Sequence, residues 1–243
     1  MEKRRLRPWV IITFSMICLI GIIYYSYQVI MWNLHVKENN KIQKEIEENI
    51  KVKKEDASYE IDFEALKKVN PDTVAYIKVN NTNINYVVVK GKDNDYYLNH
   101  NFEKKWNVAG WIFGDYHNKF DETDKNLIIY GHNTKDNSMF DTLKNVLESK
   151  WYKNKENHIV TLITEQNTYQ YEVFSTYSIK PESYYINTSF KDDNEFGKFV
   201  NTLKTRSIYD YGVEVKKEDK ILTLSSCLGE GQKRVVLHAR LIQ

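Results

Sequence analysis

The sequence contains little cysteine, proline and glycine, and each scarcity narrows the class of protein it can encode. Its 243 residues include three prolines and nine glycines, too few for a collagen-like or proline-rich low-complexity chain. One of its two cysteines lies inside a long apolar run, so the remainder of the chain cannot form an internal disulfide. Hydrophobic residues make up 42% and charged residues 28%, which is a globular composition.

Outside the N-terminus neither positive nor negative charge is in clear excess. The net charge is +2, and four basic residues with one acidic residue among the first seven give +3 there, which leaves −1 for the rest. A body so close to neutral lacks the basic surface that binds a phosphate backbone. Nucleic acid is therefore not expected as a partner.

One long apolar run, Trp9–Trp32, has 24 residues without Asp, Glu, Lys, Arg or His. As a helix it can span about 30 Å of hydrocarbon. Basic residues precede it and a charge-balanced stretch follows, so we expect a single pass with a cytoplasmic tail (1–8), a transmembrane anchor (9–32) and an extracellular remainder. A cleaved signal peptide is the alternative, but the run is long for one and no small-x-small cleavage site follows.

A helical spacer, 33–58, is expected between the anchor and a folded domain at 59–243. The segment Lys37–Asp56 contains six lysines and six acidic residues, which is typical of a solvated helix, either a plain linker or a spacer packed on the body. Its narrow apolar stripe consists of three isoleucines spaced four apart, Ile42, Ile46 and Ile50.

From about Tyr59 the pattern changes to short apolar segments separated by turns. Helices are expected at Asp62–Val69, stopped by Asn70-Pro71, and at Phe190–Arg206. Many short strands, few helices and no β-α-β alternation favour an antiparallel barrel or sandwich. The strand candidates are Val74–Val79, Ile84–Val89, Gly110–Phe113, Leu127–Tyr130, Ile159–Thr164, Tyr169–Ile179, Ile221–Ser226 and Arg234–Ile242, with shorter helical segments at Asp93–Asn99 and Ser138–Leu147.

Cys227 is the only cysteine outside the apolar run, which contains Cys18. An unpaired thiol in an exported domain can be buried and inert, form an intermolecular bridge, or act as a nucleophile. Cys227 follows the strand candidate Ile221–Ser226 and precedes a glycine-containing loop. A strand end holds a side chain rigidly within reach of a substrate, which favours the nucleophile.

A thiol nucleophile needs a proton-transfer partner and a donor for the developing oxyanion. His132 directly follows an apolar strand, as Cys227 does, whereas His238 lies mid-strand as a candidate wall residue. Arg234 is seven residues after Cys227, so a short loop can fold its permanently charged guanidinium back beside the thiol, and Arg240 is the second candidate. The remaining histidines are expected at the surface, as for His35 and His158, or in polar loops, as for His100 and His117.

These residues resemble the motifs of sortases. The order His, Cys, Arg agrees, and the three matching segments are Tyr130-Gly131-His132-Asn133, Thr223-Leu224-Ser225-Ser226-Cys227 and Lys233-Arg234-Val235-Val236. Features similar to class B sortases are the segments Gly91–Leu98 and Lys135–Phe140 and the helical insertion Phe190–Arg206. The resemblance covers roughly Tyr59 to Gln243. It departs in two places, because Ser226 replaces the usual Thr and the loop between Cys and Arg is short.

The resemblance implies a mostly-β fold, an eight-stranded sortase-type β-barrel with N-terminal helices and a helical insertion before the catalytic Cys strand. It implies a membrane-bound cysteine transpeptidase on the outer face of a Gram-positive cell, acting on surface proteins with a C-terminal sorting signal. Cys227 would attack the Thr carbonyl, Arg234 would hold the signal and stabilise the oxyanion, and His132 would protonate the departing amine. An amine of a peptidoglycan precursor, or a pilin lysine, would then accept the acyl group.

The same resemblance gives candidates for the substrate groove, and these are Asn94, Leu98, Tyr185, Ile186 and Ser225. No cofactor is implied, and no cluster of ligand residues at metal spacing occurs in the sequence. Two other functions remain open. A cysteine enzyme that cross-links or hydrolyses cell-wall peptides would also use Cys227 and His132, and a membrane-tethered β-domain that binds a surface partner would carry an inert Cys227.

Overall fold

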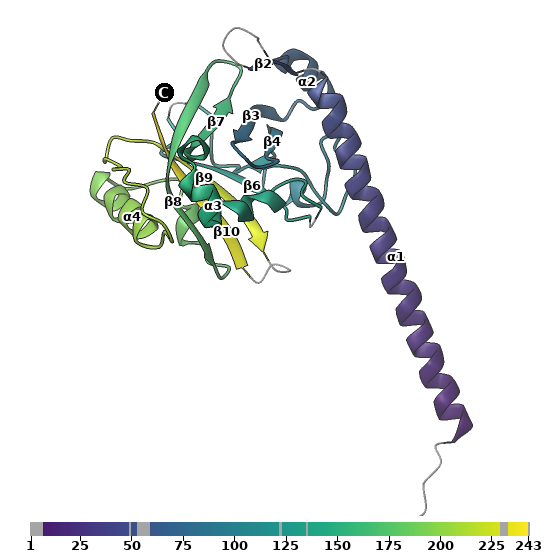
Figure 1. Ribbon diagram of the computed structural model, residues 1–243. Helices are drawn as coiled ribbons and strands as arrows, with labels where there is room; N and C mark the ends of the chain where they lie inside the picture. The colour runs from purple at the N-terminus through teal and green to yellow at the C-terminus, as the bar shows by residue number, and fades with distance from the viewer. Residues whose placement is uncertain are drawn as a thin grey trace, which may run out of the picture.

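A long N-terminal helix and a closed β-barrel are the two main parts of the structure (Figure 1). The computed structural model describes residues 7–48, 50–52, 59–121, 123–134, 136–228 and 233–242. At 50–52 and 227–228 it describes the backbone alone. Several residues used in the sequence argument lie outside the described residues, and these are Lys3, Arg4 and Arg5 of the N-terminal tail, Lys135 and the loop between the last two strands.

Eight strands close the barrel in the order β10-β8-β7-β3-β4-β5-β6-β9. The pairs β4–β5 and β6–β9 are parallel, and the other pairs are antiparallel. The predicted eight-stranded barrel is confirmed. Its strands are β3 (Thr73–Val79), β4 (Asn85–Val89), β5 (Phe113–Gly114), β6 (Asn126–Gly131), β7 (Ile159–Ile163), β8 (Thr168–Ile179), β9 (Ile221–Leu228) and β10 (Lys233–Leu241).

The barrel wall separates two apolar clusters. Along β10 the side chains alternate, so that Val235 and Leu237 pack inside the barrel while Val236 packs outside it. The outer cluster is covered by α4 (Asp193–Thr205), whose Phe196 is buried there. The predicted helical insertion is therefore confirmed. It begins at Asp193 because the Asp192 carboxylate accepts the Glu195 amide hydrogen at 2.9 Å and caps the helix.

Short helical segments join the strands. Helix α2 (Phe63–Val69) begins after its capping residue Asp62 and ends before Pro71, as predicted. The helical segment predicted at Ser138–Leu147 is shorter in the structure, where it is the 3₁₀ helix η2 (Asp141–Leu147). The remaining segments are η1 (Tyr96–Leu98), α3 (Ser149–Lys153), η3 (Lys155–His158) and η4 (Tyr184–Ile186).

The strand predicted at Gly110–Phe113 is shorter in the structure. Strand β5 contains only Phe113 and Gly114. Gly110 has φ +58°, in the left-handed region, so the backbone turns there and cannot be extended. The preceding loop therefore delivers its residues to the end of the barrel instead of extending the sheet.

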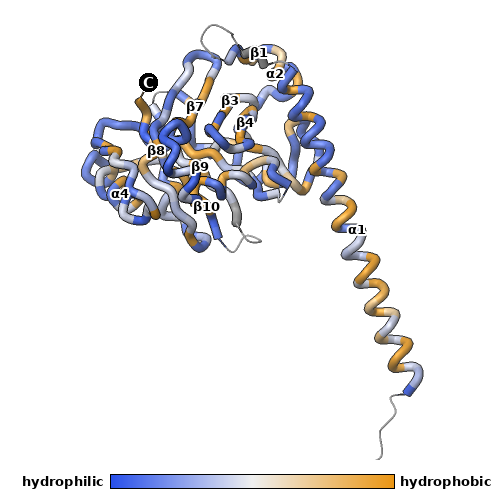
Figure 2. The backbone as a smooth tube through the Cα atoms, viewed as in Figure 1, coloured by the Kyte–Doolittle hydropathy of each residue, from blue (hydrophilic) through white to orange (hydrophobic). Residues whose placement is uncertain are grey.

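Helix α1 (Pro8–Glu47) joins the expected anchor and most of the expected spacer in one helix of 40 residues. Its first part is apolar and exposed, and it is long and apolar enough to cross a membrane (Figure 2). Its last part packs against the barrel through one face, which buries Val36, Asn39, Ile42, Gln43 and Ile46.

The spacer helix was predicted to be longer than it is. Helix α1 ends at Glu47, and Ile50 lies in β1 (Ile50–Val52), which pairs antiparallel with β2 (Tyr59–Ile61). The β-branched residues Ile50 and Val52 favour an extended backbone, and β2 supplies its hydrogen-bonding partner. The rest of the expected spacer, residue 49 and residues 53–58, lies outside the described residues.

Candidate active site

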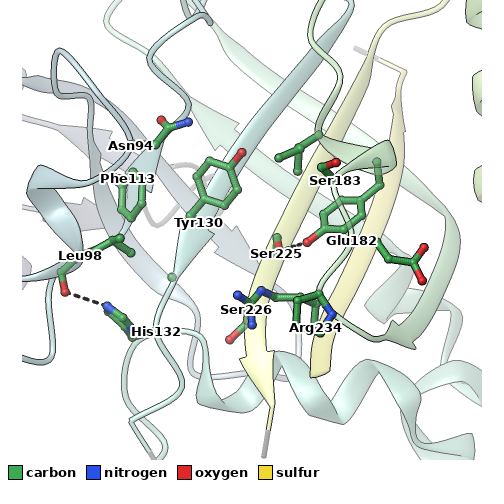
Figure 3. Close-up of a pocket in the computed structure, with 14 residues that line it drawn as sticks. Asn94, Leu98, Phe113, Tyr130, His132, Glu182, Ser183, Ser225, Ser226 and Arg234 are labelled. Atoms are coloured by element: carbon green, nitrogen blue, oxygen red, sulfur yellow. Dashed lines mark hydrogen bonds between the residues drawn. The ribbon is translucent and has the colours of Figure 1, made fainter. Parts of the chain in front are cut away.

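A cavity of about 480 Å³ opens where β6 and β9 end and β10 begins (Figure 3). All five groove candidates from the sequence line it, and so do His132 and Arg234. The structure thus gathers into one cavity side chains that are up to 140 positions apart in the sequence. Further lining residues that the sequence argument did not assign are Phe113, Tyr130, Gly131, Pro181, Glu182, Ser183 and Ser226.

The strand register brings the three candidate catalytic positions together. Strand β6 pairs parallel with β9, and the last pair is Gly131 with Ser226. The next residue along the chain is His132, directly after the end of β6, and Cys227, within β9. On the other side of β9, Arg234 of β10 is the direct partner of Cys227. These three positions therefore lie side by side on neighbouring strands, and the Cys227 side chain itself is outside the described residues.

His132 is held through its ring. Its Nε2 lies 2.7 Å from the backbone carbonyl oxygen of Leu98. Because a carbonyl oxygen only accepts, Nε2 carries the hydrogen and Nδ1 carries the lone pair of the neutral ring. Burial lowers the pKa of His132 below its ordinary value and the nearby charge of Arg234 lowers it further, although the Leu98 hydrogen bond opposes both. The imidazole is therefore mainly neutral at pH 7.

Arg234 lies across the cavity rim from His132, with Ser226 between them in the view of Figure 3. Its Nη1 donates to the backbone carbonyl oxygen of Lys233 at 3.3 Å. A guanidinium presents five N–H donors in a fixed fork, so it can serve several acceptors at once. A charged fork at this place can bind a carbonyl oxygen or a developing oxyanion.

Ser225 and Tyr185 form part of the cavity wall as a hydrogen-bonded pair. The Tyr185 hydroxyl lies 2.9 Å from the Ser225 Oγ, and both side chains are almost fully buried. The exposed Leu98 side chain and the half-buried Ile186 add apolar surface. The cavity therefore combines apolar walls with a few fixed polar groups, which is typical of a ligand site.

A buried carboxylate organises the opposite wall. Asp115 accepts hydrogen bonds from Asn94 Nδ2 at 2.8 Å and from the Tyr130 hydroxyl at 2.9 Å. It also accepts from the backbone amide of His117 at 3.0 Å and contacts the His117 ring at 2.8 Å. Burial alone would raise the pKa of Asp115, but these hydrogen bonds hold it below its usual range. Sequence reasoning missed Asp115 because no motif contains it.

His238 and Arg240 are structural residues. His238 is fully buried in the barrel wall, with Nδ1 2.9 Å from Thr223 Oγ1 and Nε2 2.9 Å from the Tyr177 hydroxyl. Burial lowers its pKa to about 3. The prediction of a wall residue is confirmed. Arg240 does not line the cavity, because its guanidinium pairs with Glu172 at 2.9 Å.

Two other histidines are less exposed than predicted. His158 is half-buried because it packs among aromatic rings, including that of Tyr211 at 4.8 Å between centroids. His35 is half-buried because α1 contacts the barrel there, and its Nδ1 accepts the backbone N–H of Val108 at 3.3 Å. His100 stacks on Tyr96 with centroids 3.9 Å apart. Within the described residues, no group of His, Cys, Asp and Glu side chains has the arrangement of a metal site.

Comparisons with known proteins agree with this geometry. Residues 77–242 match the Sortase domain family. Sortase B of Staphylococcus aureus is 32% identical over 227 residues, which cover 91% of this chain and 92% of that protein. Sortase B of Listeria monocytogenes is 36% identical over 180 residues, which cover 73% of this chain and 72% of that protein.

Solved structures give the same result. The crystal structure of sortase B from Bacillus anthracis in complex with AAEK1 has a TM-score of 0.76 at 33% identity and covers 86% of this chain and 99% of that one. A Staphylococcus aureus sortase B–substrate complex has a TM-score of 0.70 at 37% identity, covering 74% and 84%. The fold, the motifs and these relatives together show that the chain belongs to the sortase family, in its class B, and is a cysteine transpeptidase.

Proposed function

We propose that the chain is a membrane-anchored transpeptidase that cleaves the C-terminal sorting signal of surface proteins after Thr. It then joins the acyl group to an amine of a peptidoglycan precursor, with a pilin lysine as the alternative acceptor. The observation that carries this proposal is the register that places His132, Cys227 and Arg234 on neighbouring strands at the cavity rim.

Each residue of this group has a separate chemical role. His132 Nδ1 takes the thiol proton of Cys227, the resulting thiolate attacks the Thr carbonyl carbon, and the Arg234 guanidinium stabilises the oxyanion that forms. The C–N bond then breaks, and the departing amine takes a proton from His132 Nδ1. The incoming amine attacks the thioacyl-enzyme, gives its proton to His132 and releases the thiolate. The thioester conserves the acyl bond energy until that amine arrives.

The cavity is proposed to hold the sorting signal. Leu98 and Ile186 offer apolar contacts, while Asn94 and the Tyr185–Ser225 pair offer hydrogen bonds. The solved Staphylococcus aureus sortase B–substrate complex, with a TM-score of 0.70 to this chain, supports a substrate site in this fold. We assign the substrate-binding role to these five residues.

Helix α1 is proposed to anchor the enzyme in the cell membrane. Its exposed apolar part has a mean hydropathy of 2.0 over an 18-residue window, and basic residues precede it in the sequence. The positive-inside rule then places the N-terminus in the cytoplasm and the barrel outside. The proposed organisation is a tail (1–8), an anchor (9–32), a spacer (33–58) and a catalytic domain (59–243).

The test is a cleavage assay with the full chain in detergent micelles. The enzyme is incubated with a panel of sorting-signal peptides and triglycine as the amine, since a sortase B has been solved in complex with triglycine. Mass spectrometry should show cleavage after Thr and a triglycine adduct, both absent in Cys227→Ala. Cleavage of cell-wall peptides instead would favour a wall cross-linking or hydrolysing enzyme. No cleavage, with Cys227 unreactive to thiol probes, would favour a binding domain.

A further inference from the structure

The end of α1 that packs on the barrel makes buried polar contacts with one loop beside the active site. Asn39 of α1 is only 1% exposed, and its Nδ2 donates to the backbone carbonyl oxygen of Gly110 at 2.9 Å. Asn107 is fully buried, and its Nδ2 lies 3.0 Å from Asn39 Oδ1 and 3.0 Å from the backbone carbonyl oxygen of His35. Buried polar groups that satisfy one another fix a specific geometry, which apolar packing alone does not.

These contacts order the loop from Asn107 to Gly110. The backbone N–H of Val108 donates to His35 Nδ1 at 3.3 Å, and that of Ala109 to Asn107 Oδ1 at 3.0 Å. The backbone N–H of Gly110 donates to the Asn107 carbonyl oxygen at 2.9 Å. Every amide after Asn107 in this loop is therefore held by α1 or by a residue that α1 binds.

Gly110 in turn packs against the proposed catalytic histidine. A Cβ atom added at Gly110 would lie 2.9 Å from His132 Cδ2 and 2.7 Å from the Leu98 carbonyl oxygen. That carbonyl oxygen is the acceptor for His132 Nε2. The Gly110 backbone therefore supports both the imidazole ring and the group that fixes its tautomer.

We propose that Asn39 is a positioning residue for catalysis, and that the barrel-facing end of α1 belongs to the active-site support. The supporting contacts lead from Asn39 to the Gly110 backbone, and from there to Leu98 and His132. This inference rests on the proposed role of His132 in proton transfer. Such transfer depends on geometry, since a misplacement of about 1 Å can cost about 100-fold in rate. The helix that tethers the enzyme thereby also holds the proton-transfer group in place.

Gln43 offers a matched control on the same helix. It lies one turn after Asn39, is 8% exposed, and its Nε2 donates to the Asn85 carbonyl oxygen at 2.7 Å. Asn85 belongs to β4 and does not line the cavity. Gln43→Ala removes one hydrogen bond from α1 to the barrel, and Asn39→Ala removes two, those to Gly110 and Asn107. Only Asn39→Ala removes a contact to the His132 support.

The experiment compares these two variants with the unmodified full chain in detergent micelles, using the peptide and triglycine assay. Asn39→Ala should lower kcat about tenfold, a part of the 100- to 10,000-fold that a positioned acid–base group supplies, with little change in KM for the peptide. Gln43→Ala should keep kcat. Circular dichroism melting should show a loss of stability for both variants, larger for Asn39→Ala, so kcat is compared at a temperature where both remain folded. Equal kcat for the two variants would overturn the proposal.

A second readout does not depend on turnover. The pKa of His132, measured by NMR on histidine-labelled protein, should rise toward its ordinary value in Asn39→Ala because a loosened ring is better hydrated. It should stay unchanged in Gln43→Ala. If the unmodified chain showed no transpeptidation, the proposed function would fail, while this shift would still support or contradict the role of Asn39.

Discussion

A Cβ atom added at Gly110 would lie 2.9 Å from His132 Cδ2, so one added methyl group tests how closely the ring is held. Gly110→Ala should cost about 1–3 kcal/mol because its φ of +58° disfavours a side chain, and the methyl group should also displace His132. Gly212→Ala is the control, because its φ is +67° and an added Cβ would meet no atom within 4 Å. Urea unfolding should show the larger loss of stability for Gly110→Ala, because its Cβ would also lie 2.5 Å from the Tyr97 carbonyl oxygen and 2.7 Å from that of Leu98. Where both variants remain folded, only Gly110→Ala should lose most of kcat. Similar kcat in both variants would contradict the contact.

Arg234 should influence the protonation of His132. The pKa of His132 is lowered by burial and by the positive charge of Arg234, so the acidic limb of the kcat/KM profile should lie below pH 6.5. Arg234→Gln removes the charge and should raise the pKa of His132, whereas Arg234→Lys keeps the charge and should preserve it. NMR titration of the imidazole measures this in all three proteins. An unchanged pKa in Arg234→Gln would disprove the electrostatic coupling.

His238 should make the stability of the protein pH-dependent. Burial lowers its pKa from 6.5 to about 3 in the folded state, so between these values only the unfolded state binds the proton. Stability therefore falls as pH falls through this window, by about 1.4 kcal/mol per pH unit. Urea unfolding between pH 5.5 and 4.5 should show this slope, and His238→Gln should reduce it by about that amount. Equal slopes would contradict a neutral buried His238.

The sequence predicts the site residues that belong to recognisable motifs. It does not predict site residues whose neighbours come together only when the chain folds. His132, Cys227 and Arg234 each follow or begin an apolar strand, a pattern visible in one dimension. Asp115 has no such pattern, because its role arises where Asn94 and other donors converge on one carboxylate. Convergence of this kind depends on strand order, which composition and spacing do not supply.

At the scale of elements, η4 is held by a chain of buried hydrogen bonds. The chain runs from the Tyr184 hydroxyl through Tyr177, His238 and Thr223 to Asn126. The Asn126 Nδ2 then donates to the backbone carbonyl oxygens that flank the end of η4, those of Tyr185 at 3.3 Å and Asn187 at 2.9 Å. The turn that carries two of the groove residues is thereby fixed from within the barrel wall.

Breaking this chain should affect peptide binding more than chemistry. Asn126→Ala leaves two buried carbonyl groups without this donor and should destabilise the fold by about 1–3 kcal/mol. Because η4 contributes Tyr185 and Ile186 to the cavity, KM for the peptide should rise several-fold while kcat changes less. Steady-state kinetics at a temperature well below the melting point measure both. A fall in kcat alone would show that Asn126 acts elsewhere.

The elements that differ from prediction are those set by backbone geometry. The strand predicted at Gly110–Phe113 fails because positive φ at Gly110 forces a turn that apolar periodicity does not reveal. Likewise the isoleucine stripe predicts helix through Ile50, although β2 offers a strand partner from another part of the sequence. Longer elements with strong patterns, such as β8 and α4, agree with prediction because many residues specify them.

At the scale of the whole molecule, barrel closure creates the active site. The parallel pairing of β6 with β9 joins segments 95 positions apart, beginning with Asn126 opposite Ile221. Sequence patterns favour antiparallel neighbours joined by turns and give no signal for this pair. Only the shared family motifs indicated that His132 and Cys227 belong together, and the register supplies the physical reason.

The two parts of α1 should contribute very differently to the fold, which truncation can separate. Removing residues 1–32 deletes exposed apolar surface and leaves the barrel contacts of Val36, Ile42 and Ile46 intact. Removing residues 1–48 exposes the surface that these three side chains cover, each worth about 1.5–3 kcal/mol, against a total stability of about 5–15 kcal/mol.

The shorter truncation should therefore yield a soluble protein with the melting temperature and transpeptidase activity of the full chain. The longer truncation should melt about 10 °C lower or more, since about 1 kcal/mol shifts Tm by about 2–4 °C at this size. It should also lose activity at temperatures where it remains folded, because Asn39 no longer supports Gly110. Differential scanning calorimetry and the peptide assay measure both effects. Equal melting temperatures would show that α1 is only a tether, since its packing would then contribute nothing to the barrel.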